Sequence, residues 1–135
     1  MLRLARNDGG AAIEFALVAP IFLLMLLGIL VYGLYFGLSH SIEQLAAQAA
    51  RVSVAGLDDT ERESLAEDYL ADNARYYPLV EADRLSISAA PAAGEPDVFV
   101  VTLNYNLTGS VLDLFPAFLP NPEIAASAAI QRGGY

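Results

Sequence analysis

The chain has 135 residues, of which 56% are hydrophobic, and its 7 Lys and Arg against 16 Asp and Glu give a formal net charge of −9. This length leaves room for one small domain beside a membrane segment, and the acidic balance excludes nucleic-acid binding through a basic surface. The sequence contains no cysteine, which excludes disulfides and thiolate metal sites and leaves any domain outside the membrane to be stabilised by packing alone.

The first strong feature along the chain is an apolar run. After the short basic segment of residues 1–9, MLRLARNDG, no charged residue occurs between Phe15 and Leu38. These roughly 24 residues give about 36 Å of helix, enough to cross a hydrocarbon core of about 30 Å. We therefore expect a transmembrane helix that begins around Ala11. A secretory signal peptide is the competing interpretation, but its apolar core would be shorter and would end at a small-residue cleavage site.

The charges on either side of the run predict its orientation. Arg3 and Arg6 precede it, whereas the chain that follows is strongly acidic. Positive charge flanks the cytoplasmic end of a membrane span. We therefore expect a single-pass protein of a bacterial inner membrane, with the N-terminus in the cytoplasm and the bulk of the chain in the periplasm.

Several residues stand out within this run or at its edge. Glu14 places a carboxylate near the N-terminus of the expected helix, at the edge of the apolar run. The helix macrodipole favours a negative charge there, whereas the hydrocarbon core of a bilayer disfavours it. Pro20 lies inside the expected helix, where it removes one backbone hydrogen bond and should bend the axis. Gly33 and Gly37 form a G-x-x-x-G pattern, which is typical of close packing between membrane helices but also arises by chance.

Beyond the run, apolar residues continue at helical spacing and predict an amphipathic extension of the same helix. These residues are Leu38, Ile42, Leu45, Ala49 and Val52. Gly56 is expected to end the helix. We therefore divide the chain into a leader peptide, residues 1–9, a transmembrane helix with its amphipathic extension, residues 10–55, and a periplasmic α+β domain, residues 56–135.

A second helix is expected next. Its start fits two capping-box patterns, Asp58-x-x-Glu61 and Thr60-x-x-Glu63, and Pro78 lies at or just past its end. Its acidic residues lack the alternating oxygen ligands and central glycine of a calcium loop, so we interpret them as a solvated face. The expected apolar face consists of Leu65, Ala66, Tyr69, Leu70, Ala74 and Tyr77.

The rest of the chain predicts strands. Apolar and polar residues alternate over residues 85–89, 99–107 and 124–130. Residues 89–96, AAPAAGEP, are expected to form a turn or loop. Residues 111–122, VLDLFPAFLPNP, are expected to form an apolar loop whose side chains fit core packing and partner contact equally well. The predicted fold is therefore α+β, with a long N-terminal transmembrane and amphipathic helix, a second helix, and a small antiparallel sheet of about three strands.

The sequence shows no catalytic constellation. It has no G-x-S-x-G motif, no phosphate-binding loop and a single histidine, His40, which we interpret as a solvated polar residue. We therefore expect a structural protein that is not an enzyme and that needs no cofactor and no metal.

The N-terminal residues GGAAIEFALVAPIFLLMLLGIL resemble the N-terminus of TadE-like pseudopilins, the minor pilins of the Tad/Flp branch of type IV pili. Gly9 would precede the cut, Glu14 would be the fifth residue of the mature chain, Phe15 the sixth, and Pro20 lies within the apolar run. The segments VFVVTLNYNL and EIAASAAIQR, with the proline-rich loop between them, are similar to the paired strands of this family.

This resemblance implies processing and assembly. A prepilin peptidase would cut on the cytoplasmic side between Gly9 and Gly10, since a cut after Gly10 would make Glu14 the fourth residue. The other implied partners are a second minor pilin, the major pilin, the inner-membrane assembly platform and the lipid bilayer. The implied role is the initiation or the tip of a Tad/Flp pilus that serves adhesion or secretion, with the subunit becoming part of the extracellular filament.

The resemblance also implies a use for the carboxylate. The cut creates a new amine on Gly10, and pairing of Glu14 with that amine on a neighbouring subunit, beside Phe15, would set the axial stagger between subunits. Two other functions stay open. The chain could be a single-pass periplasmic adaptor of a secretion apparatus that never enters a filament, or a secreted domain whose signal peptide is removed.

Overall fold

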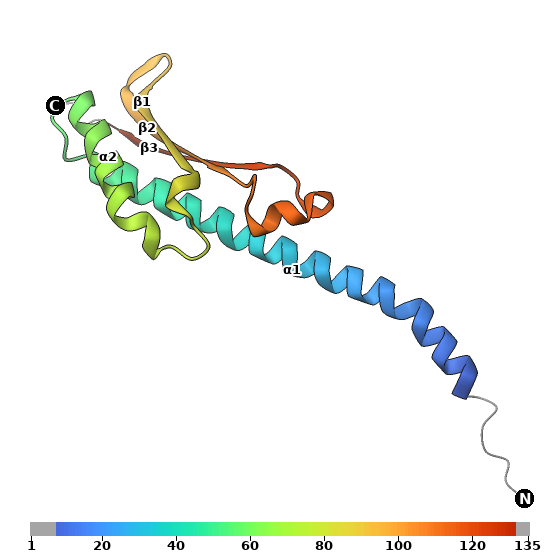
Figure 1. Ribbon diagram of the computed structural model, residues 1–135. Coiled ribbons are helices and arrows are strands. Elements are labelled where there is room, and N and C mark those ends of the chain that lie inside the picture. Colours follow the sequence, from blue (N-terminus) through green and yellow to red (C-terminus); the bar gives the residue numbers. More distant parts are fainter. Residues whose placement is uncertain (1–7, 132–135) are drawn as a thin grey trace, which may run out of the picture.

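The computed structural model describes residues 8–131, in which a long helix carries a small α+β domain along its C-terminal half (Figure 1). Helix α1 spans Asp8–Ser53 and α2 spans Asp59–Asn73. The strands are β1 (Leu85–Ala92), β2 (Glu95–Asn106) and β3 (Glu123–Gln131). Four short 3-10 turns lie between these elements: η1 (Ala74–Tyr76), η2 (Ala82–Arg84), η3 (Val111–Leu114) and η4 (Pro116–Phe118). The predicted fold class is confirmed.

Helix α1 is long and apolar enough to cross a membrane, and it fits a single-pass anchor. It begins at Asp8, earlier than the predicted start around Ala11. Gly9 and Gly10 are weak helix formers, but each residue added to an existing helix gains a backbone hydrogen bond without a new nucleation step. The helix therefore extends back through both glycines.

The sheet is antiparallel with the order β1-β2-β3, so β2 is the central strand. Val101 of β2 lies opposite Ala89 of β1 and Ala128 of β3. The alternating apolar residues of β2 all point into the core, as predicted, and they are almost fully buried: Phe99, Val101, Leu103 and Tyr105. The residues between them, Val100, Thr102 and Asn104, point to the other face of the sheet and are only partly buried.

The turn or loop predicted over residues 89–96 is a turn, but it is much shorter than predicted. Strand β1 continues to Ala92 and β2 begins at Glu95, so only two residues connect them. Gly94 has a φ of +85°, which glycine adopts in tight turns without steric cost. Pro91 is compatible with pairing because β1 is an edge strand, and the pairing register shifts directly after it. A proline-containing stretch of this kind looks like a loop until the sheet order is known.

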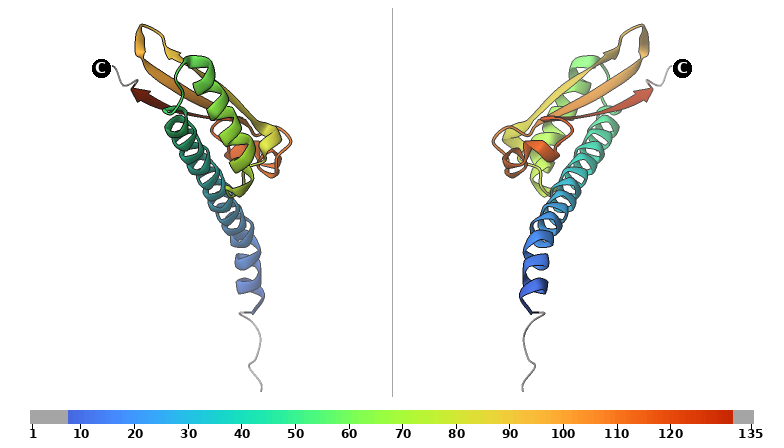
Figure 2. Two further views of the ribbon diagram at one scale, coloured as in Figure 1. Left: turned by 90° about the vertical axis from the view of Figure 1, so that its left-hand side faces the viewer. Right: turned by 90° about the vertical axis from the view of Figure 1, so that its right-hand side faces the viewer.

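The C-terminal half of α1 is covered from two sides, by the sheet and by α2 (Figure 2). The predicted apolar stripe is buried except for Val52, which is partly buried, and the buried face is wider and includes Ala46 and Ala50. It also includes two serines that bond to their own helix. Ser41 Oγ donates to the Gly37 carbonyl at 3.0 Å and Ser53 Oγ to the Ala50 carbonyl at 2.7 Å. The wider face follows from packing against two partners at once.

The structure decides between the two possible starts of α2. Asp58 is the N-cap, and its Oδ1 accepts a hydrogen bond from the Glu61 N–H at 2.8 Å. Glu61 Oε2 in turn accepts from the Leu57 N–H at 2.7 Å. The predicted apolar face meets the core through its buried residues, Ala66 and Leu70 of α2 and Ala74 of η1.

The role predicted for Gly56 is wrong, because α1 already ends at Ser53. Gly56 is buried instead, and a Cβ atom there would lie 2.7 Å from the backbone nitrogen of Arg62. The glycine is therefore required for the close approach between the α1–α2 connection and the first turn of α2.

Candidate functional site

The predicted cleavage site lies at the N-terminal end of α1. Gly9 and Gly10 are both exposed, and a Cβ atom added to either would meet nothing within 4 Å. Each glycine in a helix costs about 1 kcal/mol relative to alanine, so this end of α1 is easier to unwind than the rest. The bond between them is therefore sterically accessible, and local opening would present it in extended form. The predicted leader comprises residues 1–9, of which residues 1–7 lie outside the described residues.

Glu14 and Phe15 are the residues predicted to pair between subunits, and neither is used within the monomer. Glu14 is exposed, and no hydrogen bond or ion pair engages its carboxylate within residues 8–131. Phe15 is 72% exposed. Gly10 and Glu14 are four residues apart and share one face of the helix. This face is one that the rest of the described chain, residues 8–131, leaves uncovered.

Pro20 lies inside α1. The N-terminal, blue part of the ribbon turns away from the axis of the remaining helix in both views of Figure 2. The proline removes one N–H donor from the helix in this part. That it causes a kink stays a prediction.

The two glycines of the predicted packing motif differ in what they meet. A Cβ atom at Gly33 would touch nothing within 4 Å, whereas one at Gly37 would lie 3.7 Å from Cδ1 of Leu79. Among the glycines of α1, Gly28 leaves the least room for a side chain, since a Cβ atom there would lie 3.3 Å from Cε1 of Phe118. Sequence reasoning missed Gly28, although it lies on the same stripe as Leu38 at steps of three and four residues.

The proline-rich segment that was expected to be a loop forms η3 and η4 and packs along α1. Leu112 is buried, and Phe115, Phe118 and Leu119 are partly buried against the core. Val111 is 68% exposed and Leu114 is 73% exposed. Some apolar side chains of this segment therefore pack in the core, while others are exposed and remain available for contact with a partner.

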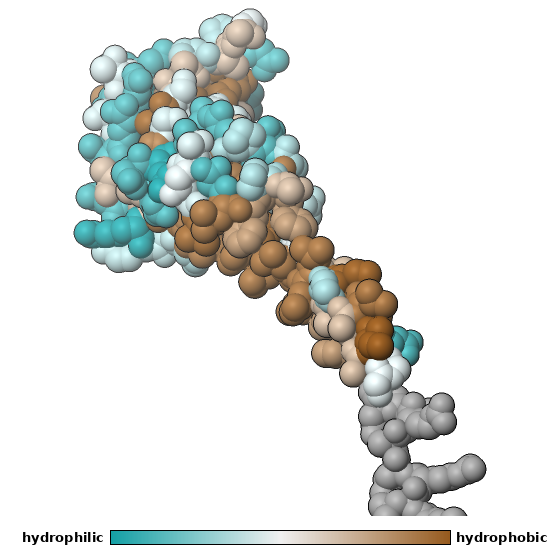
Figure 3. Space-filling model, turned by 45° about the vertical axis from the view of Figure 1, so that its right-hand side comes forward, coloured by the Kyte–Doolittle hydropathy of each residue, from teal (hydrophilic) through white to brown (hydrophobic). Residues whose placement is uncertain are grey.

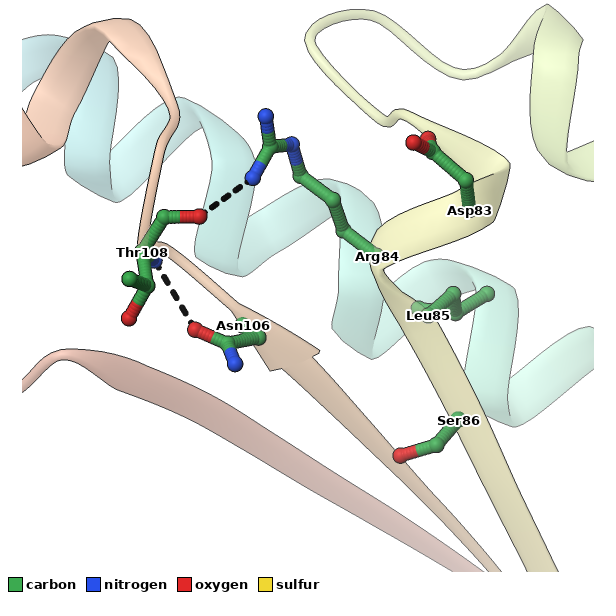
Figure 4. Close-up of a pocket in the computed structure, with 6 residues that line it drawn as sticks. All are labelled: Asp83, Arg84, Leu85, Ser86, Asn106 and Thr108. Carbon is green, nitrogen blue, oxygen red and sulfur yellow. Dashed lines mark hydrogen bonds between the residues drawn. The ribbon is translucent and has the colours of Figure 1, made fainter.

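A polar hollow of about 420 Å³ lies between η2, β1 and the end of β2 (Figure 4). Arg84 dominates it, and its guanidinium donates to Glu81 Oε2 at 2.6 Å and to the carbonyls of Thr108 and Gly109. The hydrogen bond to Glu81 raises the pKa of Arg84. These hydrogen bonds hold the turn after β2 against η2. We therefore interpret the hollow as a place where Arg84 stabilises the fold, and not as a ligand-binding site.

A second, apolar cavity of about 310 Å³ lies between α1, the segment before η2 and η3. The hydroxyl of Tyr105 reaches its edge, where it accepts a hydrogen bond from the Glu81 N–H at 3.2 Å. Burial raises the pKa of the Tyr105 hydroxyl. The cavity is bordered by Leu34, Leu38, Leu79, Val111 and Leu112.

The described residues hold no cluster suited to metal chemistry. Within residues 8–131, no three His, Cys, Asp or Glu side chains are grouped so as to hold a metal ion. His40 is exposed and lies beside Glu43 and Gln44 of its own helix, in agreement with its interpretation as a solvated residue.

Comparison with known proteins identifies the N-terminal segment. The model of the TadE-like protein family matches residues 9–51. The match begins at the predicted cleavage site and ends two residues before the end of α1. No curated protein and no solved structure gives a significant match to the chain.

Proposed function

The chain is TadE-like over its N-terminal helix, and on this basis we propose that it is a minor pilin of a Tad/Flp-type pilus. The TadE-like match associates it with Tad pili in general, and the apolar helix fits a single-pass membrane anchor. The proposal adds that a prepilin peptidase removes residues 1–9, and that the mature subunit then takes part in pilus initiation or forms part of the tip. The chain would act as a structural component and not as an enzyme.

One observation carries the proposal. Within a segment that matches the family, the cleavage site, the carboxylate and the neighbouring aromatic ring all lie on a part of α1 that the domain does not cover. The large apolar residues from Ile13 to Leu26 are between 54% and 72% exposed. A helix with this much apolar surface must be covered by lipid, by other subunits, or by each in turn.

The carboxylate of Glu14, which is unpaired within residues 8–131, supports the proposal that other subunits cover this part of α1 after assembly. An ionised group within the hydrocarbon core costs several kcal/mol unless it finds a partner. After cleavage, the Gly10 amine of a neighbouring subunit would supply a positive partner for Glu14. Because such a pair forms at one axial offset, it would fix the register between subunits more than it would add net stability.

The cleavage step is tested by intact mass spectrometry of the full chain, expressed with and without a prepilin peptidase. We expect a product that begins at Gly10 only when the peptidase is present. Replacement Gly9→Val should block the cut, whereas Gly33→Val, in the same helix, should not. An uncut chain would favour the secretion adaptor, and a chain that starts after the apolar run would show a removed signal peptide. Either result would contradict the proposal.

The pairing step is tested separately with Glu14→Val and the matched variant Glu43→Val. Both glutamates are exposed on α1, but Glu43 lies beyond the apolar run. We expect both variants to be cut, and only Glu14→Val to lose co-purification with partner pilins and incorporation into pili. Normal incorporation of the Glu14→Val subunit would refute the pairing role while leaving cleavage and anchoring in place.

A further inference from the structure

The end of the domain nearest to the uncovered part of α1 carries an apolar surface, which we name the loop belt. The loop belt consists of Leu79, Val111, Leu114, Phe115, Phe118 and Leu119. Leu79, Val111 and Leu114 are each more than half exposed. Figure 3 shows hydrophobic surface that runs without a break from the uncovered part of α1 onto the end of the domain nearest to it. The belt is therefore continuous with the membrane-spanning surface.

The length of uncovered helix is too short for a bilayer. From Phe15 to Leu26 the large apolar side chains of α1 are exposed, and Leu27 is the first that packs partly against the core. This stretch of roughly a dozen residues gives about 18 Å of helix. A hydrocarbon core is about 30 Å thick, so the bilayer must extend roughly 12 Å farther along α1, past the level of Gly28.

The loop belt occupies that remaining length. Phe118 packs on Gly28, and Leu79 lies next to Gly37. Both contacts lie on the last part of the uncharged run, which ends at Leu38. If α1 spans the membrane, the belt must lie at the depth of the outer leaflet.

An aromatic cluster marks the same level independently. Tyr32 lies about 26 Å from Phe15 along the helix, and its ring centroid is 5.0 Å from that of Phe36 and 6.3 Å from that of Tyr35. Tyrosines concentrate where the hydrocarbon meets the headgroups, because their rings are amphipathic. The boundary predicted from these rings falls between the two levels at which the belt contacts α1.

The chemistry of the belt suits lipid. Between Leu107 and Glu123 the only ionisable residue is Asp113, and its Oδ2 accepts a hydrogen bond from the Gly109 N–H at 2.8 Å. Leu79 has a φ of +66°, a conformation that leucine rarely adopts. The turn therefore holds an exposed apolar side chain toward α1 at some cost in backbone strain.

We propose that the loop belt inserts into the outer leaflet, so that the acyl chains and the headgroup boundary of phospholipids cover Val111, Leu114 and Leu79. The domain then rests on the membrane and is held by its own loops as well as by α1. This inference requires that α1 spans the bilayer, but it does not depend on cleavage or on assembly into a pilus.

The experiment uses the absence of cysteine in the chain. Leu114→Cys and Val111→Cys, each carrying a nitroxide, are placed in the full chain at one chain per nanodisc of phosphatidylcholine and phosphatidylglycerol. The matched control is Leu57→Cys, since Leu57 is also a highly exposed leucine, at 90%, in the α1–α2 connection at the other end of the domain. Circular dichroism verifies that each labelled variant is folded.

Power saturation with oxygen and a water-soluble nickel chelate measures the depth of each label. We expect oxygen to reach the labels at positions 111 and 114 more readily than the chelate does, with the opposite order at position 57. Equal access of the chelate to positions 114 and 57 would overturn the proposal. Shielding from both reagents at one chain per disc would show that the chain's own side chains cover these positions, and would overturn the proposal. Shielding that appears only with two chains per disc would show a second copy as the occupant, and would overturn it as well.

Discussion

The two halves of α1 have the same secondary structure and opposite surroundings. In the N-terminal half, Leu24 and Phe22 are more than half exposed, whereas Ile42 and Leu45 in the C-terminal half are completely buried. From Phe15 to Leu38 the helix carries no charged residue on any face, whereas beyond Leu38 it is apolar on one face only. The comparison shows that one continuous helix can fit two environments, an uncovered apolar one and the surface of a folded domain, because its pattern of apolar residues changes along its length.

The change between the halves is gradual. The domain's loops overlap the apolar run from Gly28 to Gly37, so a segment of helix exists where protein covers one side and lipid, as we propose, covers the other. The anchor and the domain core are therefore not separate units joined by a linker.

The strongest test of the comparison removes the same side chain from each half. Leu45→Ala should destabilise the domain by about 2–5 kcal/mol, because it leaves a cavity in a packed core. Leu24→Ala should change the domain's free energy of unfolding by less than about 0.5 kcal/mol, since no described side chain packs over this residue. Urea unfolding in detergent, followed by circular dichroism, measures both. Similar losses for the two variants would break the distinction.

A second test adds volume instead of removing it. Ala49 is fully buried on the covered face and Ala47 is exposed on the same helix. Ala49→Leu should cost about 1–3 kcal/mol through overpacking between α1 and the domain, and Ala47→Leu should be nearly neutral. The same unfolding measurement applies. A neutral Ala49→Leu variant would show that the covered half is loosely packed.

A third test weakens α2, one of the elements that cover the C-terminal half of α1. Asp58→Ala removes the N-cap of α2 and should cost about 1 kcal/mol. Glu63→Ala, an exposed position of the same helix, is the matched control. The melting temperature of the domain in detergent should fall for the first variant only. If both fell equally, the loss would reflect charge and not the cap.

The smallest expected effect is a change in the stability of the domain at alkaline pH. The hydrogen bond to Tyr69 raises the pKa of Tyr77 to about 12. Because this pKa lies above its usual value near 10, the folded state holds the proton more tightly than the unfolded state. The stability that it contributes is complete below pH 10 and is lost between pH 10 and 12. Tyr77→Phe should show a shallower alkaline loss of stability than the unaltered chain, and Tyr76→Phe should not.

Much of the fold could be predicted from local patterns. The alternation from Phe99 to Tyr105 and the capping residues at Asp58 each identify their element without further context. The ends of the two strands around residues 89–96 could not be predicted in this way, because Pro91 can belong to a paired strand only if that strand lies at the edge of the sheet. Gly28 escaped notice for another reason. Within a uniformly apolar run, no polar residue marks which face of the helix is covered.

The candidate site divides in the same way. The sequence by itself determined the apolar run, the isolated Glu14 and the glycines before it, since these depend on composition and order alone. Only the tertiary structure decided that the domain leaves this end of α1 bare, and that the proline-rich segment lies against Gly28. Such contacts join residues about 90 positions apart in the chain. Local preferences cannot specify them, because they arise only when the sheet has placed η3 and η4 beside the helix.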